Sequence, residues 1–135
     1  MRIGLLEDNP GVSDYMSTLL KLEGHTVEEY THGSCLLVRL FTETEVRFPL
    51  PYDLLIVDLL LPGMLSGLQT IQTIHQRLSP AQLPILIVTA LSLAEIEEIT
   101  TGLTSVPILR KPFHRSVLLQ MIEDLTSGHD TKDRE

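Results

Sequence analysis

The sequence contains no tryptophan, a single cysteine and few aromatic residues, which make up 4% of the chain. One cysteine excludes an intramolecular disulfide framework. That cysteine, Cys35, is followed by Leu36, Leu37 and Val38, and this apolar context predicts a small buried core residue. Basic residues are also scarce, since 10 Lys and Arg stand against 18 Asp and Glu, for a formal net charge of −8. This balance argues against binding of nucleic acid or of an anionic membrane surface.

Long apolar runs are absent as well. None approaches the roughly 18 residues that a membrane-spanning helix needs, and no basic segment followed by an apolar core predicts a signal peptide. A chain of 135 residues is long enough for one domain with a substantial core. We therefore expect a cytoplasmic domain over residues 1–126. Residues 127–135 are polar and unpatterned, which predicts a frayed tail or the root of a linker.

The chain does contain a regular alternation of short apolar runs and helical patterns. Runs apolar throughout predict parallel strands covered on both faces. Helical spacing follows each run, with predicted helix starts near Pro10, Gly33, Ser66 or Gly67, Ser92, and after Pro112. The predicted strands are residues 3–6, 26–30, 54–57, 85–88 and 106–109. Five such units predict an α/β fold, a flavodoxin-like doubly wound (βα)5 domain with a five-stranded parallel sheet in the order 2-1-3-4-5.

Chemistry-bearing residues follow four of the five predicted strands. Glu7 and Asp8 follow the first, Asp58 the third, Thr89 the fourth and Lys111 the fifth. The carboxyl ends of parallel strands meet at one edge of a sheet, where ligands bind in open α/β folds. Each residue alone has an ordinary structural explanation, such as a helix-start charge, a turn residue or a solvated cation. Together they predict a functional site at that edge.

The residue types are chemically coherent. Three carboxylates close together repel one another and require a cation, and oxygen ligands without His or Cys suit Mg²⁺. A carboxylate can attack phosphorus to form an aspartyl-phosphate. Phosphoryl transfer needs mainly positioning and charge neutralisation, for which Lys111 offers a positive charge and Thr89 a hydroxyl.

The chain resembles the receiver domain of a two-component response regulator over about residues 1–126. The motifs are Glu7-Asp8, Asp58 followed by Pro62-Gly63, Thr89-Ala90 and Lys111-Pro112-Phe113. The resemblance implies that Asp58 is the phosphoacceptor, and that Asp8, Asp58 and the backbone carbonyl of Leu60 bind Mg²⁺, with Glu7 acting through water. It also implies that Lys111 pairs with the phosphoryl group, that Thr89 is the switch hydroxyl, and that the Lys111-Pro112 bond is cis.

Four features depart from the family pattern. The acidic pair is Glu7-Asp8 rather than two Asp, a variation that should still bind Mg²⁺. The segment from Pro62 to Gly67 is one residue longer than usual, and Ile108 stands where the family usually has Tyr or Phe. Ile108 is stiff and has no hydroxyl, so an aromatic rotamer switch is not expected. The loop at residues 42–52 is also long and contains two prolines. The sequence assigns this loop no role.

As partners, the resemblance implies a sensor histidine kinase or a phosphotransfer protein. The resemblance also allows a second copy of this chain as partner, in a homodimer through the fourth helix, fifth strand and last helix. The main alternative is a receiver-like interaction module that works without phosphorylation, which the intact set of site residues disfavours. An Asp-dependent phosphatase would need a second Asp two residues after the nucleophile, where this chain has Leu60 or Pro10. A flavodoxin would need a hydroxyl-rich phosphate loop, which the first strand-helix turn lacks.

Overall fold

A parallel sheet forms the centre of the protein. The computed structural model describes residues 1–59, 66–99 and 106–134, and it describes their side chains except at residues 99 and 127–134. In these ranges five strands form one sheet in the order β2-β1-β3-β4-β5, with every neighbouring pair parallel. The strands are β1 (Arg2–Leu6), β2 (Thr26–Tyr30), β3 (Leu54–Val57), β4 (Ile85–Thr89) and β5 (Ile108–Arg110). The predicted strand order is therefore confirmed.

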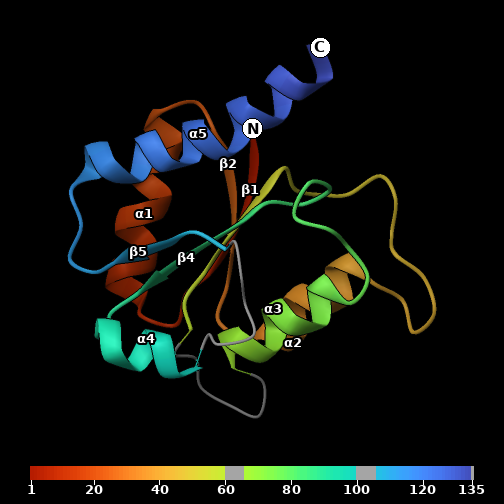
Figure 1. Cartoon of the computed structure of the whole chain (residues 1–135), viewed down its shortest axis with the longest axis horizontal. Coiled ribbons are helices and arrows are strands. Elements are labelled where there is room, and N and C mark those ends of the chain that lie inside the picture. Colours follow the sequence, from red (N-terminus) through yellow and green to blue (C-terminus); the bar gives the residue numbers. More distant parts are fainter. Residues whose placement is uncertain (60–65, 100–105, 135) are drawn as a thin grey trace.

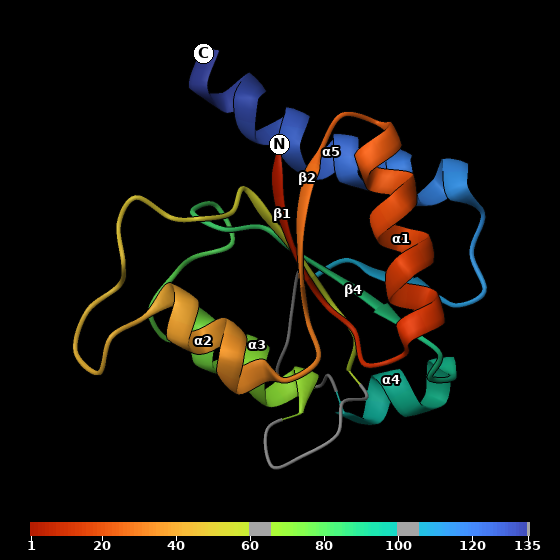
Figure 2. The same ribbon diagram turned by 180° about the vertical axis from the view of Figure 1, so that it is seen from behind.

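Helices cover both faces of this sheet. They are α1 (Pro10–Leu22), α2 (Gly33–Leu40), α3 (Gly67–His75), α4 (Leu93–Ile99) and α5 (Arg115–Arg134). Helices α1 and α5 lie on one face, and α2, α3 and α4 lie on the other (Figures 1 and 2). This two-sided cover is the doubly wound arrangement that the alternating pattern predicts. Among the described helices, none has the length and apolar character needed to cross a membrane.

The central strands β3 and β4 are buried along their whole length. Their side chains alternate between the two layers, because successive residues of a strand point to opposite faces. Leu54 and Ile56 pack with α1 and α5, whereas Leu55 and Val57 pack with α2, α3 and α4. Both faces therefore need apolar residues, and this explains why the runs are apolar throughout rather than alternating.

Local signals place the helix starts where the sequence predicts them. The Asn9 side chain caps α1 by accepting a hydrogen bond from the Val12 amide at 3.1 Å, with Pro10 at the first helical position. Ser66 and Gln69 form a capping box at the start of α3. The predicted box at the start of α4 is confirmed by the Glu95 amide, which donates to Ser92 Oγ at 3.2 Å. These caps mark the starts of α1, α3 and α4.

Three local predictions need correction or extension. Cys35 is exposed rather than buried, because α2 buries the single stripe that contains Gly33, Leu36 and Leu40. Helix α3 ends at His75, before the expected break at Ser79-Pro80. Helix α5 continues to Arg134 through the predicted tail, since backbone hydrogen bonds extend a helix without an apolar pattern. The domain boundary at residue 126 stays a prediction.

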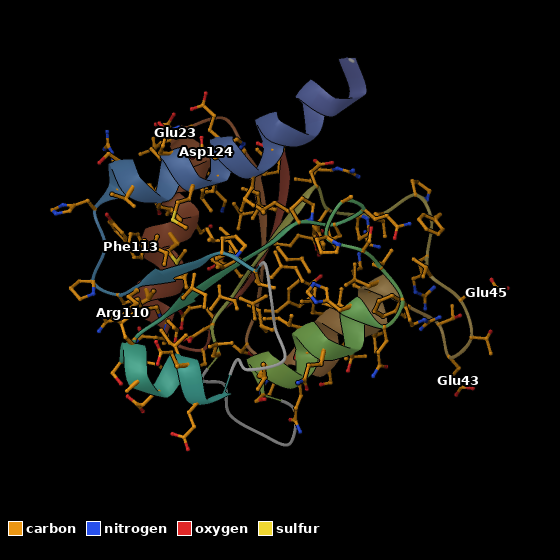
Figure 3. All side chains as sticks on the ribbon, viewed as in Figure 1. Glu23, Glu43, Glu45, Arg110, Phe113 and Asp124 are labelled. Atoms are coloured by element: carbon orange, nitrogen blue, oxygen red, sulfur yellow. The ribbon has the colours of Figure 1, made fainter. Side chains whose placement is uncertain are left out.

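The long loop between α2 and β3 has defined internal contacts. Phe41 and Val46 form an isolated antiparallel bridge. The Arg77 guanidinium lies 4.5 Å from the centroid of the Phe41 ring and donates a hydrogen bond to the Thr42 carbonyl at 3.1 Å. Figure 1 shows the loop projecting beside α2 and α3, and Figure 3 labels Glu43 and Glu45 at its outer end. Arg77, which follows the end of α3, thus anchors the loop to that helix.

Candidate functional site

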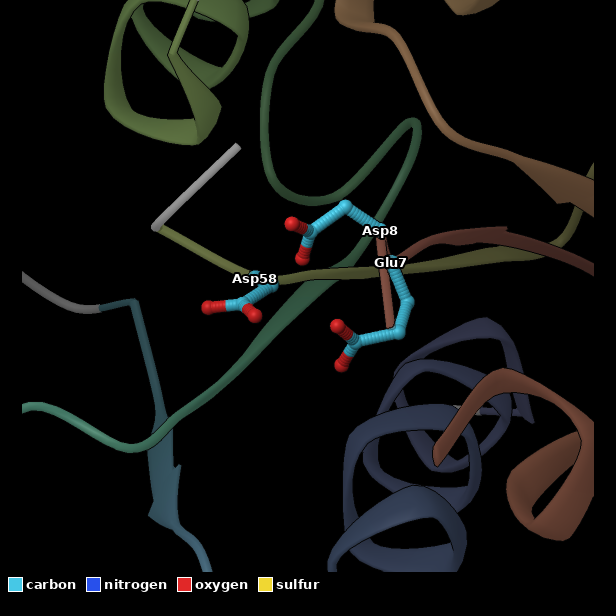
Figure 4. Close-up of side chains that lie close together, drawn as sticks. All are labelled: Glu7, Asp8 and Asp58. Carbon is cyan, nitrogen blue, oxygen red and sulfur yellow. The ribbon is translucent and has the colours of Figure 1, made fainter. Parts of the chain in front are cut away.

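Three carboxylates converge at the carboxyl ends of β1 and β3. Glu7 and Asp8 follow β1 directly, and Asp58 follows β3. Each residue offers one oxygen, and these oxygens all lie within 4.8 Å of one another. Figure 4 shows the three side chains gathered around a common space. The structure therefore brings together the acidic residues that the sequence places at separate strand ends.

Backbone contacts hold two of these residues in place. The Asp58 amide donates to the Leu6 carbonyl at 2.9 Å, so the ladder between β1 and β3 continues into the site. The Glu7 amide donates to the Tyr30 carbonyl at 3.0 Å, which extends the pairing of β1 with β2. The carboxylate of Glu7 also accepts a hydrogen bond from the Asn9 amide at 3.2 Å. The site is thus built on the sheet rather than on a free loop.

Lys111 is the cation that faces this cluster. Its Nζ lies 2.5 Å from Glu7 Oε1 and 3.1 Å from Asp58 Oδ2. Glu7 and Asp58 are 2% and 6% exposed, so two nearly buried carboxylates share one ammonium. The Lys111-Pro112 peptide bond is cis, as predicted. In this structure Lys111 forms ion pairs with these two carboxylates, and its pairing with a phosphoryl group stays a prediction.

The pKa values of Glu7 and Lys111 reflect these surroundings. Burial raises the pKa of Glu7, and the negative charge of Asp58 adds to this effect, while hydrogen bonds from Lys111 and Asn9 oppose it. Burial alone would lower the pKa of Lys111. The hydrogen bond to Glu7 and the charge of Asp58 outweigh burial, so the pKa of Lys111 is raised. Lys111 therefore stays a cation at neutral pH.

Thr89 lies at the same edge of the sheet. It is the last residue of β4, it is fully buried, and its carbonyl accepts a hydrogen bond from the Lys111 amide at 2.8 Å. Its hydroxyl oxygen accepts a hydrogen bond from the Leu91 amide at 3.3 Å. The Thr89 hydroxyl is therefore engaged with the turn that leads into α4.

Leu60, whose carbonyl is predicted to bind Mg²⁺, lies outside the described residues, as does most of the lengthened segment after Asp58.

Sequence reasoning missed the importance of Gly67, the first residue of α3. A Cβ at this position would lie 1.8 Å from the Asp58 carbonyl oxygen. Glycine therefore allows α3 to start directly against the backbone of Asp58. The available signal was a glycine directly after a capping serine.

The donor set of this site fits a hard cation. Glu7, Asp8 and Asp58 offer carboxylate oxygens, and the cluster contains no His or Cys. Such ligands suit Mg²⁺, which retains several waters and frequently shares a phosphate oxygen. Lys111 adds a fixed positive charge beside Asp58. The arrangement can therefore neutralise an anionic group that approaches the Asp58 carboxylate.

Comparison with known proteins points in the same direction. A sequence model described as the response regulator receiver domain matches residues 3–123. The chain is 28% identical over 132 residues to the cell cycle response regulator CtrA of Brucella ovis, with 96% of this chain and 53% of the relative covered. The chain thus spans about half the length of the curated relatives that it matches.

Solved structures share the fold. A CheY-like response regulator receiver domain protein from Methanospirillum hungatei gives a TM-score of 0.78 at 22% identity, with 97% of each chain covered. The receiver domain of a sensor histidine kinase from Pseudomonas aeruginosa gives a TM-score of 0.76 at 24% identity, covering 93% of this chain and 97% of the other. That structure contains a magnesium ion coordinated in its active site cleft.

Proposed function

The chain belongs to the response regulator receiver domain family, and on this premise we propose that it is a phosphorylation-dependent signalling switch with Asp58 as phosphoacceptor. One observation carries the proposal. The Asp58 carboxylate lies beside the carboxylates of Glu7 and Asp8, and the Lys111 ammonium contacts both Asp58 and Glu7, at the carboxyl edge of the sheet. A carboxylate beside both a potential cation site and a positive charge supports the proposed role of Asp58 as nucleophile.

The donor in this proposal is a phosphohistidine of a sensor histidine kinase or of a phosphotransfer protein. An Asp58 carboxylate oxygen forms a bond to phosphorus while the bond between phosphorus and the donor's imidazole nitrogen breaks. The imidazole nitrogen leaves with the electron pair and is then protonated. Lys111 pairs with a phosphoryl oxygen, and the Thr89 hydroxyl donates a hydrogen bond to another. Since that donor is made from ATP, a cytoplasmic location belongs to the same proposal.

Mg²⁺, when bound, would neutralise charge on the phosphoryl oxygens. The family resemblance implies that Asp8 and Asp58 would hold it directly and Glu7 through water, and the convergence of the three carboxylates supports a shared ion. The Leu60 carbonyl remains part of the proposed set. The protein acts as a signalling phosphoacceptor rather than as an enzyme with turnover of its own. The proposal assigns no direct nucleic-acid binding to this chain.

The proposed output surface is the face formed by α4, β5 and α5, which could also form a homodimer. In this structure Leu91 and Ile96 are buried, whereas the Leu93 side chain is 63% exposed. A shift of the segment after Thr89 would change the exposure of this apolar group and so change partner binding. Ile108 offers no aromatic ring to turn inward, so the movement is one of backbone.

Intact-mass measurement after incubation with acetyl phosphate and Mg²⁺ tests the proposal. We expect wild-type protein to gain the mass of one phosphoryl group and Asp58→Asn to gain none. Asp53→Asn is the matched control, because Asp53 precedes the same strand at its opposite end, and it should be labelled like wild type. Labelling of Asp58→Asn would overturn the assignment. A wild-type protein unlabelled by acetyl phosphate and by kinases would favour the interaction module.

A further inference from the structure

The backbone of Leu91 is held at both of its polar groups. Its amide donates to the Thr89 hydroxyl oxygen at 3.3 Å, and its carbonyl accepts a hydrogen bond from Arg110 Nε at 3.1 Å. The Leu91 side chain is 8% exposed and belongs to the core on the α2, α3 and α4 side of the sheet. The turn between β4 and α4 is therefore tied to the adjacent strand β5 by one arginine side chain.

Arg110 reaches this turn because of its position on β5. It pairs with Thr89 in the register between β4 and β5. Ile108 packs on the α2, α3 and α4 side, whereas Leu109 packs on the α1 and α5 side. By the two-residue period of a strand, Arg110 shares the face of Ile108. Figure 3 labels Arg110 at the end of β5, close to the start of α4.

We propose that Arg110 is a positioning residue that holds the turn after Thr89 in its unphosphorylated conformation. The proposal rests on the proposed function, because the turn matters only if Thr89 must approach a phosphoryl group on Asp58. When Thr89 moves, Leu91 either follows and loses its bond to Arg110, or stays and loses its bond to Thr89. Either path breaks one hydrogen bond of the resting turn. The Arg110 bond therefore opposes the switch.

The same contact gives this chain a link between the switch turn and the proposed output face. Ile108 occupies the position of the family's aromatic residue, and its side chain cannot make a hydrogen bond. Arg110, two residues further along the same face of β5, makes the polar contact with the turn instead. Movement of Leu91 would release the Arg110 guanidinium and so change the position of its positive charge relative to α4. Arg110 would thus restrain the turn, and the conformation of its own side chain would depend on the position of the turn.

Titration with beryllofluoride in Mg²⁺, a stable mimic of the phosphoryl group, tests the proposal on wild type, Arg110→Met and Arg110→Lys. Methionine has no N–H to donate, so loss of the bond to the Leu91 carbonyl should raise beryllofluoride affinity about 2- to 10-fold in Arg110→Met. Loss of positive charge near an anionic ligand acts in the opposite direction, so the sign separates the two effects. Arg110→Lys keeps the charge and an N–H donor, so its affinity should stay closer to that of wild type.

A spectroscopic reading accompanies the titration. The Arg110 Nε–H signal should exchange slowly with solvent in the free protein and quickly once beryllofluoride is bound. Unchanged or weakened binding by Arg110→Met, while wild type binds, would overturn the role of Arg110 and leave the switch function standing. Failure of wild type to bind beryllofluoride would overturn both. An Nε–H signal that exchanges equally fast in the two states would also count against the restraint.

Discussion

Lys111 Nζ lies 2.5 Å from Glu7 Oε1, nearer than the 3.1 Å that separates the same nitrogen from Asp58 Oδ2. A phosphoryl group on Asp58 would therefore compete with Glu7 for the ammonium. Glu7 thus has two roles in the proposal, as an acid near Mg²⁺ and as the resting partner of Lys111.

Glu7→Gln should weaken Mg²⁺ binding about 10-fold, because a carboxylate near the ion becomes a neutral amide. Glutamine keeps the size of the side chain, so the fold should be unchanged. Calorimetric or fluorescence titration with Mg²⁺ measures the effect. Asp14→Asn is the matched control, since Asp14 is an exposed acid on the nearby helix α1 and lies outside the cluster. Equal Mg²⁺ affinity in Glu7→Gln and wild type would exclude Glu7 from the ion's surroundings.

Lys111→Met should destabilise the protein in the absence of Mg²⁺, because Glu7 and Asp58 lose the cation that they share. Removing one partner of a nearly buried ion pair costs about 2 to 4 kcal/mol in the free energy of unfolding. Mg²⁺ should restore part of this loss, since it neutralises the same carboxylates. Urea denaturation with EDTA and with Mg²⁺ measures both effects, and the exposed Lys21→Met serves as control. A variant as stable as wild type in EDTA would contradict the prediction.

Gly67→Ala should strongly destabilise the protein, because the added Cβ would lie 1.8 Å from the Asp58 carbonyl oxygen. Such a clash with backbone forces α3 away from the end of β3 and should cost about 2 to 4 kcal/mol. Gly11→Ala is the control, since its Cβ would meet only Asn9 Oδ1 at 3.4 Å. Alanine inside α1 should leave stability equal or slightly higher. Thermal denaturation measures the melting temperatures of the two variants. Equal melting temperatures would refute the packing argument.

Asp53→Asn should lower stability at neutral pH by less than about 1 kcal/mol, because the pair with Arg2 is exposed to solvent. Burial tends to raise the pKa of Asp53, but the hydrogen bonds and charge of Arg2 outweigh it and lower that pKa. A lowered folded-state pKa contributes stability above the unfolded pKa of 3.8, and the contribution disappears as pH falls through the folded value. Urea midpoints of wild type and variant should therefore converge in acid. A constant difference between pH 7 and acid would contradict the ion-pair origin.

The sequence by itself determined the fold and the place of the site. Apolar runs such as Leu54–Val57 predict strands buried on both faces, and the alternation with helices predicts a doubly wound parallel sheet. Because parallel strands end at one edge, Glu7, Asp58 and Lys111 had to meet there. Local signals also sufficed for helix starts, since caps such as Asn9 act over three residues.

Only the tertiary structure decided contacts between residues far apart in the chain. Lys111 and Glu7 are separated by 104 positions, so which carboxylate holds the ammonium depends on side-chain reach after the sheet has formed. Cys35 was expected in the core but is exposed. Which face of α2 is buried depends on how the helix packs against the sheet, and that face contains Gly33, Leu36 and Leu40. The hydrogen bond from Arg110 to Leu91 likewise required the pairing of β4 with β5. Periodicity fixes which residues share a face, but only packing fixes what that face contacts.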